Sequence, residues 1–217
     1  MVRDNLSALY EKLPSGVKLV AVSKFHPVER LMEAYEAGQR IFAESRPQEL
    51  SVKVPQMPSD VEWHFIGHLQ TNKLKLVLPY VSLVQSVDSL HLLQAIDRWG
   101  SEHDRVTDVL LELHLGAEET KQGFSAEEIL SMVCPPACHY RIRGLMGMAT
   151  NTDDAAVIEA DFARIESLFF RIRSEHPELA DTFTELSIGM SSDWPLAVRH
   201  GATMVRIGTD IFGPREY

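Results

Sequence analysis

The chain has 217 residues, of which 45% are hydrophobic and 24% charged, and its formal net charge is −10. This composition is typical of a globular protein, and the acidic balance argues against nucleic acid as a partner because such binding needs a basic surface. Because no run of about 18 apolar residues indicates a membrane span, and "MVRDNLSALYEKLPSG" lacks a signal-peptide core, we expect a cytoplasmic protein with no membrane partner.

The first predicted element is an amphipathic helix within residues 1–14, where Leu6, Leu9, Tyr10 and Leu13 recur at helical spacing before Pro14. Apolar, strand-like runs then alternate with helix-like segments along the whole chain. Strands are predicted at 19–22, 40–44, 61–67, 81–87, 106–115, 141–148, 183–189 and 203–208. Helices are predicted at 28–37, 69–80, 90–100, 126–133, 158–172 and 193–201, with a helical turn from 209. A polar segment that runs toward Pro55 follows the second strand.

Eight strands that each precede a helix or a helix-like connection predict parallel crossovers throughout. The two candidate architectures are an open, doubly wound sheet and a closed barrel. No Gly-x-Gly-x-x-Gly pattern follows the first strand, which argues against a dinucleotide-binding sheet. We therefore predict an α/β fold, a single (β/α)8 TIM-type barrel over residues 1–217 with the N-terminal helix packed on it.

Lys24 lies just beyond the first predicted strand, in phase with Val20 and Val22. Catalytic and binding residues of such barrels lie at the carboxyl ends of the strands. Partial burial penalises the charged form of an amine, and a neutral amine can attack a carbonyl to form a Schiff base. The alternative interpretation is a lysine that extends into solvent, as most lysines do.

The end of the chain favours the first interpretation. Arg206 alternates in phase with the apolar strand face, and Gly208 and Thr209 follow it where a helical turn can present its amides to an anion. Ser187 and Ser191 supply hydroxyls at the end of the seventh strand, which matches the phosphate site of many barrels. Because barrel closure brings strand eight beside strand one, we predict a phosphorylated aldehyde, pyridoxal 5′-phosphate (PLP), as the ligand.

Several blocks of the sequence resemble the pyridoxal phosphate homeostasis family, also called YggS/PROSC-like proteins. They are "AVSK" (21–24), "WHFIGHLQTNK" (63–73), "KQGF" (121–124), "GLMGM" (144–148), "LSIGMSSD" (186–193) and "TMVRIGTDIFGPREY" (203–217). The resemblance implies a barrel like the N-terminal domain of alanine racemase, with PLP linked to Lys24 and Arg206 facing the pyridine nitrogen. It implies that the phosphate is held by Ser187, Ser191, Gly208 and Thr209.

An arginine at the ring nitrogen disfavours its protonation and weakens the ring as an electron sink. The family also lacks the second domain with which alanine racemase supplies a catalytic tyrosine. The resemblance therefore implies a carrier or regulator in vitamin B6 homeostasis, without established turnover. We expect a monomer, with PLP-dependent apo-enzymes as candidate partners. The alternative is an amino-acid racemase or related enzyme that uses the same Schiff base.

The chain departs from the family after the second strand, where Gly-Glu-Asn-Tyr is usual and Ala43, Glu44, Ser45 and Arg46 stand here. The shorter Ser45 puts one polar contact to the cofactor in question. His68 and Trp194 also differ from the usual residues, but none of these positions alters the predicted anchor.

Other polar residues receive structural interpretations. Cys134, Cys138 and His139 lie close together in sequence but do not complete a four-ligand pattern, so no metal is expected. His64 and His68 are read as a packed histidine and a loop histidine near the barrel mouth. The lysines that follow strand ends, Lys73 and Lys121, are read as solvent-exposed, and Glu112 is expected to face a polar group inside the barrel.

Overall fold

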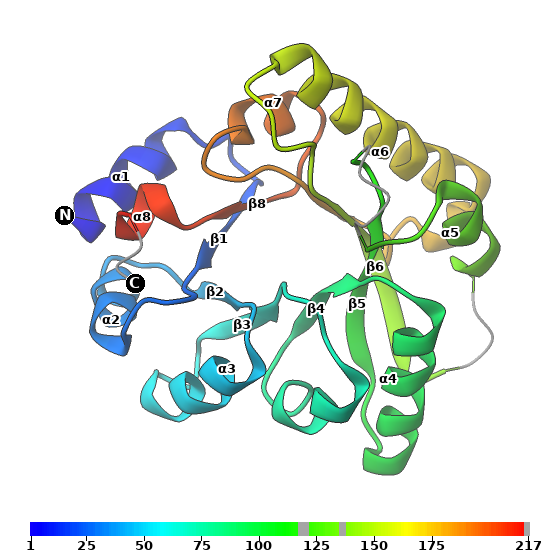
Figure 1. Ribbon diagram of the computed structural model, residues 1–217, viewed down its shortest axis with the longest axis horizontal. Helices are drawn as coiled ribbons and strands as arrows, with labels where there is room; N and C mark the ends of the chain where they lie inside the picture. Colours follow the sequence, from blue (N-terminus) through cyan, green and yellow to red (C-terminus); the bar gives the residue numbers. More distant parts are fainter. Residues whose placement is uncertain (117–121, 135–137, 215–217) are drawn as a thin grey trace.

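The computed structural model describes residues 1–116, 122–134 and 138–214. Within them, eight parallel strands close into a barrel in which each strand pairs with the next and β8 pairs with β1 (Figure 1). The predicted (β/α)8 fold is thus confirmed. The strands are β1 (Lys18–Val22), β2 (Ile41–Glu44), β3 (Glu62–Phe65), β4 (Leu83–Val87), β5 (Thr107–Leu113), β6 (Tyr140–Gly147), β7 (Glu185–Ser187) and β8 (Met204–Ile207).

Helices surround the barrel, and α1 lies beside α8 on its outside (Figure 1). The described α-helices are α1 (Val2–Lys12), α2 (Val28–Glu36), α3 (Pro47–Lys53), α4 (Leu90–His103), α5 (Ala126–Met132), α6 (Ala155–Glu175), α7 (Trp194–Arg199) and α8 (Thr209–Phe212). Short 3-10 helices are η1 (Val54–Gln56), η2 (Thr71–Leu76) and η3 (Pro177–Leu179). The predicted N-terminal helix is confirmed as α1.

Two apolar layers follow from the alternation of side chains along each strand. The inward-facing residues form a small cluster within the barrel, made by Val20, Ala43, Leu83, Leu110, Met146 and Met204. A much larger cluster lies between the outside of the sheet and the helices and includes the apolar stripe of α6, formed by Ile158, Phe162, Ile165, Phe169 and Ile172. The interior is therefore packed, and a ligand site is left at the mouth.

The pairing of β1 with β8 closes the barrel and joins the two ends of the chain. Its register places Lys18 beside Met204 and Ala21 beside Ile207. The carboxyl ends of β1 and β8 consequently lie side by side. The segments that leave these two strands, from residue 23 and from residue 208, start next to each other at the mouth.

Three predicted elements differ from the observed ones. The stretch after β2, read from the sequence only as a polar segment, forms α3, whose start is favoured by Pro47 in the first turn. The helix expected over residues 69–80 is only the 3-10 helix η2 followed by turns. Finally, β7 has three residues where seven were expected.

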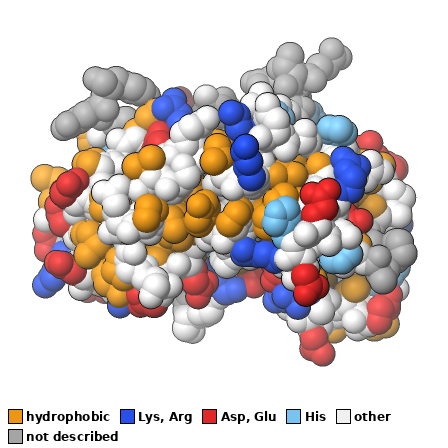
Figure 2. Space-filling model, turned by 90° about the horizontal axis from the view of Figure 1, so that it is seen from below, with side chains coloured by type: hydrophobic (Ala, Val, Ile, Leu, Met, Phe, Trp, Pro, Cys, Tyr) orange, Lys and Arg blue, Asp and Glu red, His pale blue; other side chains and the backbone are white. Residues whose placement is uncertain are grey.

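The surface mixes charges of both signs. Figure 2 shows one face on which apolar side chains form an interrupted band, with basic, acidic and histidine side chains interspersed at its right-hand end. Among the helices in the described part of the chain, none combines the length and the apolar character needed to cross a bilayer.

Candidate functional site

A cavity of about 490 Å³ opens at the carboxyl ends of the strands. Its volume lies within the usual range of roughly 300–1,000 Å³ for small-molecule pockets. Its apolar wall is formed by Val22, Ile66, Met146, Met148 and Met190. Its polar lining is formed by Lys24, His26, Ser191, Ser192, Arg206, Gly208, Thr209 and Asp210.

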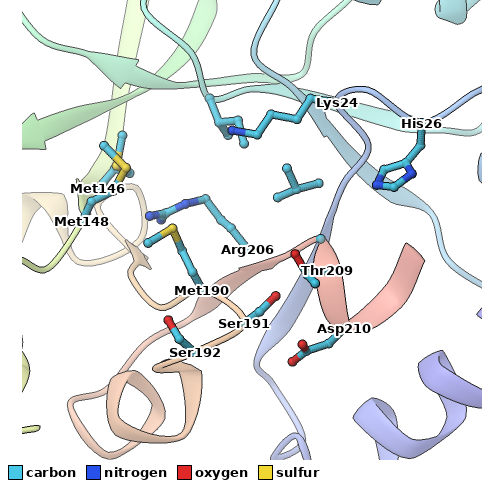
Figure 3. Close-up of a pocket in the computed structure, with 13 residues that line it drawn as sticks. Lys24, His26, Met146, Met148, Met190, Ser191, Ser192, Arg206, Thr209 and Asp210 are labelled. Atoms are coloured by element: carbon cyan, nitrogen blue, oxygen red, sulfur yellow. The ribbon is translucent and has the colours of Figure 1, made fainter. Parts of the chain in front are cut away.

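Lys24 enters this cavity from the turn that follows β1. The side chain is half-buried, and Figure 3 shows it extending from one side of the cavity while Ser191 and Thr209 lie on the other. These residues are far apart in sequence and are brought together by the β1–β8 pairing. The predicted meeting of Lys24 with the end of strand eight is therefore observed.

The side opposite Lys24 is made by the two loops that follow β7 and β8. Ser191 and Ser192 stand before α7, and Gly208 and Thr209 stand at the start of α8. A Cβ atom at Gly208 would lie 3.1 Å from the carbonyl oxygen of Val22, so the glycine lets β8 approach β1 closely. First-turn amides have no intrahelical acceptor, and hydroxyls and amides gathered in this way suit an anion.

Arg206 is 4% exposed and lines the cavity between these loops and Lys24 (Figure 3). Its Nη1 donates to the carbonyl oxygen of Ser187 at 2.8 Å and to the Ser187 hydroxyl at 2.7 Å. Its Nη2 donates to the carbonyl oxygen of Gly147 at 2.9 Å. Burial lowers the pKa of Arg206 to about 10, against the opposing effect of Glu112 and Asp193. The guanidinium is thus still charged at neutral pH.

Ser187 does not line the cavity with the other predicted residues. It is fully buried within the barrel, where its hydroxyl donates to Gln85 at 2.6 Å and accepts from Arg206. Gln85 in turn contacts His64 through a 2.8 Å hydrogen bond. The structure therefore brings five of the six predicted residues to one cavity and uses the sixth to hold Arg206 in place.

Several lining residues were not predicted. Met146, Met148 and Met190 form one side of the cavity, and His26 lies on another, with its ring 4.8 Å from that of Phe212. Met146 and Met148 lie at the carboxyl end of β6, and Lys24 likewise follows the carboxyl end of β1. Position at a strand end was therefore the signal that could have identified them. The loop residues Ser192 and Asp210 carried no comparable signal.

The sequence did not identify the polar groups that Glu112 faces. In the structure, Asp88, Arg206 and His68 influence its carboxyl group. Burial, together with the smaller effect of nearby Asp88, raises the pKa of Glu112 to about 7, against the opposing effects of Arg206 and His68. His68 Nδ1 lies 2.9 Å from an Asp88 carboxylate oxygen. The interior of the barrel thus contains a carboxyl group that titrates near neutral pH.

The two histidine predictions are confirmed. His64 is buried, and burial, assisted by the charge of Lys18, lowers its pKa to about 3. His68 lies in the loop after β3, with about half of its side chain exposed.

The cysteine segment is arranged differently from its sequence order. Cys138 donates to the carbonyl oxygen of Tyr140, and the His139 amide donates to Asp97. Cys134 instead lies near two residues distant in sequence, His176 and Glu178, with the three potential ligand atoms within 4.8 Å of one another. Lys121, another residue considered above, lies outside the described residues.

Comparisons with known proteins agree with this architecture. A family model for the alanine racemase N-terminal domain matches residues 1–216. A relative from Pasteurella multocida, named pyridoxal phosphate homeostasis protein, is 38% identical over 209 residues that cover 94% of this chain and 88% of the relative.

Solved structures show the same relationship. The structure of PipY from Synechococcus elongatus with PLP bound is 37% identical, has a TM-score of 0.87, and the match covers 98% of this chain and all of PipY. Alanine racemase from Clostridium difficile is 15% identical with a TM-score of 0.78, and the match covers all of this chain and 57% of the racemase. The racemase therefore shares the fold over part of its length.

Proposed function

The chain belongs to the pyridoxal phosphate homeostasis proteins, within the alanine racemase N-terminal domain family, and on this premise we propose that it binds PLP at the barrel mouth through a Schiff base with Lys24. Its function is to hold PLP for intracellular vitamin B6 homeostasis, with PLP-dependent apo-enzymes as the recipients. The PLP-bound structure of PipY, a full-length relative, supports the cofactor assignment.

The observation that carries the proposal is that one cavity contains both an amine and a group of hydroxyls and backbone amides suited to an anion. Lys24 lies across the cavity from Ser191 and Thr209, and the residues present fit a phosphorylated aldehyde. When bound, PLP supplies an aldehyde conjugated to an electron-withdrawing ring. The Lys24 nitrogen condenses with the aldehyde carbon and a water molecule leaves.

The phosphate is assigned to the loops after β7 and β8. The hydroxyls of Ser191 and Thr209 donate to it, and Gly208 lets the backbone approach it. Ser187 acts indirectly in this proposal, because its hydroxyl and carbonyl oxygen are occupied by Arg206 and Gln85. The apolar side of the cavity covers the ring.

Arg206 is assigned to the pyridine nitrogen. A guanidinium only donates hydrogen bonds, and its pKa of about 10 keeps it charged at neutral pH. A fixed positive charge at that nitrogen disfavours a ring proton and thereby weakens carbanion stabilisation.

The test is to saturate the purified protein with PLP, reduce it with borohydride and map the modified peptides. We expect a pyridoxyl group on Lys24 in the wild type, none in Lys24→Ala, and full labelling in the matched control Lys75→Ala, whose lysine is exposed on η2. An unmodified Lys24 in saturated wild-type protein would refute the proposal. Incubation of the loaded protein with L-alanine separates the two functions, since a racemase yields D-alanine and a carrier does not.

A further inference from the structure

The turn that carries Lys24 has a strained backbone. Phe25 has a φ of 69°, and among the described residues the other non-glycine residue with a positive φ is Asp104. Asp tolerates this conformation through its short polar side chain, whereas a bulky aromatic residue does so at a steric cost. Such strain persists only where surrounding contacts impose it, and it gathers at functional sites.

Two charged side chains from α3 impose it here. The Phe25 N–H donates to Glu49 Oε2 at 2.9 Å, and Lys53 Nζ donates to the carbonyl oxygen of Ser23 at 2.9 Å. Lys53 Nζ also donates to Glu49 Oε2 at 3.0 Å. The backbone is therefore held on both sides of Lys24 by one connected pair.

A third charged residue anchors this pair to the barrel. Glu44, at the end of β2 and fully buried, accepts from Lys53 Nζ at 2.7 Å and from the Ser23 hydroxyl at 2.7 Å. Although burial alone favours its neutral form, the Phe25 N–H and Lys53 hold the pKa of Glu49 below its ordinary value, so it is ionised at neutral pH. Burial raises the pKa of Glu44, against the opposing effects of Lys53 and Ser23. The three side chains thus form a Glu44–Lys53–Glu49 cluster that is linked by hydrogen bonds to the backbone of the Lys24 turn.

The outer side of the turn is covered as well. The Arg46 guanidinium lies over the Phe25 ring, 4.2 Å from its centroid, and Arg46 pairs with Glu49 at 3.4 Å. The left-handed residue is therefore fixed through both its amide and its ring. Of these contacts, the hydrogen bond that the Phe25 N–H donates to Glu49 acts directly on the backbone that orients Lys24.

We propose that Glu49 and Lys53 are positioning residues for Lys24, which hold its turn in the strained conformation that aims the amine at the bound aldehyde. This inference rests on the proposed function. Glu49 and Lys53 contact the backbone of the turn. The proposed phosphate site is formed by different segments, the loops after β7 and β8. We call the hydrogen bonds of Glu49 and Lys53 to this turn the clamp. Loss of the clamp should slow the covalent step and leave the preceding non-covalent binding of PLP nearly unchanged.

The experiment follows imine absorbance after mixing the cofactor-free protein with increasing PLP concentrations. For Glu49→Ala we expect the limiting rate to fall by about 10-fold, because a misplaced nucleophile loses its near-attack geometry, while the half-saturating PLP concentration changes less than about twofold. The matched control is Glu33→Ala, which removes another carboxylate that pairs with an arginine three residues earlier, Arg30, on α2. It should match the wild type in both quantities.

A double-mutant cycle separates positioning from general stability. Phe25→Gly removes the steric cost of a positive φ, so the turn needs the clamp less. We expect Glu49→Ala to reduce the limiting rate by less than about threefold in the Phe25→Gly background, against about 10-fold alone. If Glu49→Ala does not fold, Glu49→Leu supplies the same comparison, since it keeps the apolar bulk of the side chain but offers the Phe25 amide no acceptor.

The outcomes distinguish the inference from its premise. Absence of any pyridoxyl label on wild-type Lys24 refutes the proposed function itself. A labelled wild type together with an unchanged limiting rate in Glu49→Ala, or equal losses in both backgrounds, overturns the positioning role alone. Acetic anhydride labelling of Lys24 in the cofactor-free protein gives an independent readout. Its rate should also change in Glu49→Ala and stay at the wild-type value in Glu33→Ala.

Discussion

Glu112 shows how strongly the interior of the barrel changes a single residue. The residue is 8% exposed, and its carboxyl group has a pKa of about 7, chiefly because burial and then Asp88 penalise the charged form. In an unfolded chain the same group titrates near 4.3. Folding therefore favours proton uptake by Glu112 between these two values.

This linkage predicts a stability loss at higher pH. A carboxyl group whose pKa is raised by folding contributes fully below its unfolded pKa, and the contribution is lost as the pH rises through about 7. We expect Glu112→Gln, which mimics the protonated form, to reduce the fall in Tm of the cofactor-free protein between pH 5 and pH 8. The check is thermal unfolding of both proteins at the two pH values, and an equal fall in both would contradict the raised pKa.

Gly144 shows, at the level of strands, where the sheet admits no side chain. The register between β5 and β6 shifts at this point, because Val109 pairs with Ile142 and Leu110 with Gly144. Gly144 has a φ of 152°, and a Cβ atom there would lie 1.7 Å from the carbonyl oxygen of Glu185 on β7. The clash involves backbone on both sides, so no side-chain movement can relieve it.

Gly144→Ala is therefore expected to lower the free energy of unfolding by more than about 4 kcal/mol, or to prevent folding, because it combines backbone strain with overpacking. Gly16→Ala is the matched control. Gly16 also has a positive φ, 96°, but nothing lies within 4 Å of its added Cβ, so only a conformational cost of about 1 kcal/mol is expected. Urea denaturation of the two variants measures the difference, and similar losses would argue against the clash.

At this same level the sequence predicted some elements well and others poorly. The helices over residues 126–133 and 158–172 were predicted because a local pattern determines each, and both are observed, as α5 and α6. The helix α3 has seven residues and buries only Leu50 and Lys53, so its periodicity was too short to detect. Residues 69–80 contain apolar residues at helical spacing, but tertiary packing buries them in a 3-10 helix and turns.

Across the whole molecule, closure of the barrel is what makes the site predictable. The (β/α)8 order alone places strand eight beside strand one, so Lys24 could be predicted to lie near Thr209. The clamp of Glu49 and Lys53 and the burial of Ser187 could not be predicted, because they depend on side-chain distances between distant segments. Topology was accessible from the sequence, whereas the polar network was not.

The N-terminal helix extends the influence of closure to the site. Leu6 of α1 is 1% exposed, and the side chain of Asn5 donates to the carbonyl oxygen of Ile211 in α8 at 3.0 Å. Because α8 begins at Thr209, packing of α1 supports one wall of the cavity from behind. The outer helix therefore contributes to the site without touching it.

Leu6→Ala is expected to lower the free energy of unfolding by about 2–5 kcal/mol, the cost of a cavity at a fully buried leucine. The control Val52→Ala alters a side chain that is 60% exposed and should change stability by less than about 0.5 kcal/mol. Chemical denaturation provides the measurement. A loss below about 1 kcal/mol for Leu6→Ala would show that α1 is not integral to the fold.

The seam between β7 and β8 has a consequence for redesign. Only Ser187 and Met204 are in register there, and the Arg206 side chain adds bonds from β8 to the backbones of both β7 and β6. One guanidinium thus connects three strands and also lines the cavity. Replacing Arg206 to introduce new chemistry would therefore also remove hydrogen bonds that hold β8 to β7 and β6. Such a redesign would first need other contacts that stabilise the pairing of β7 with β8.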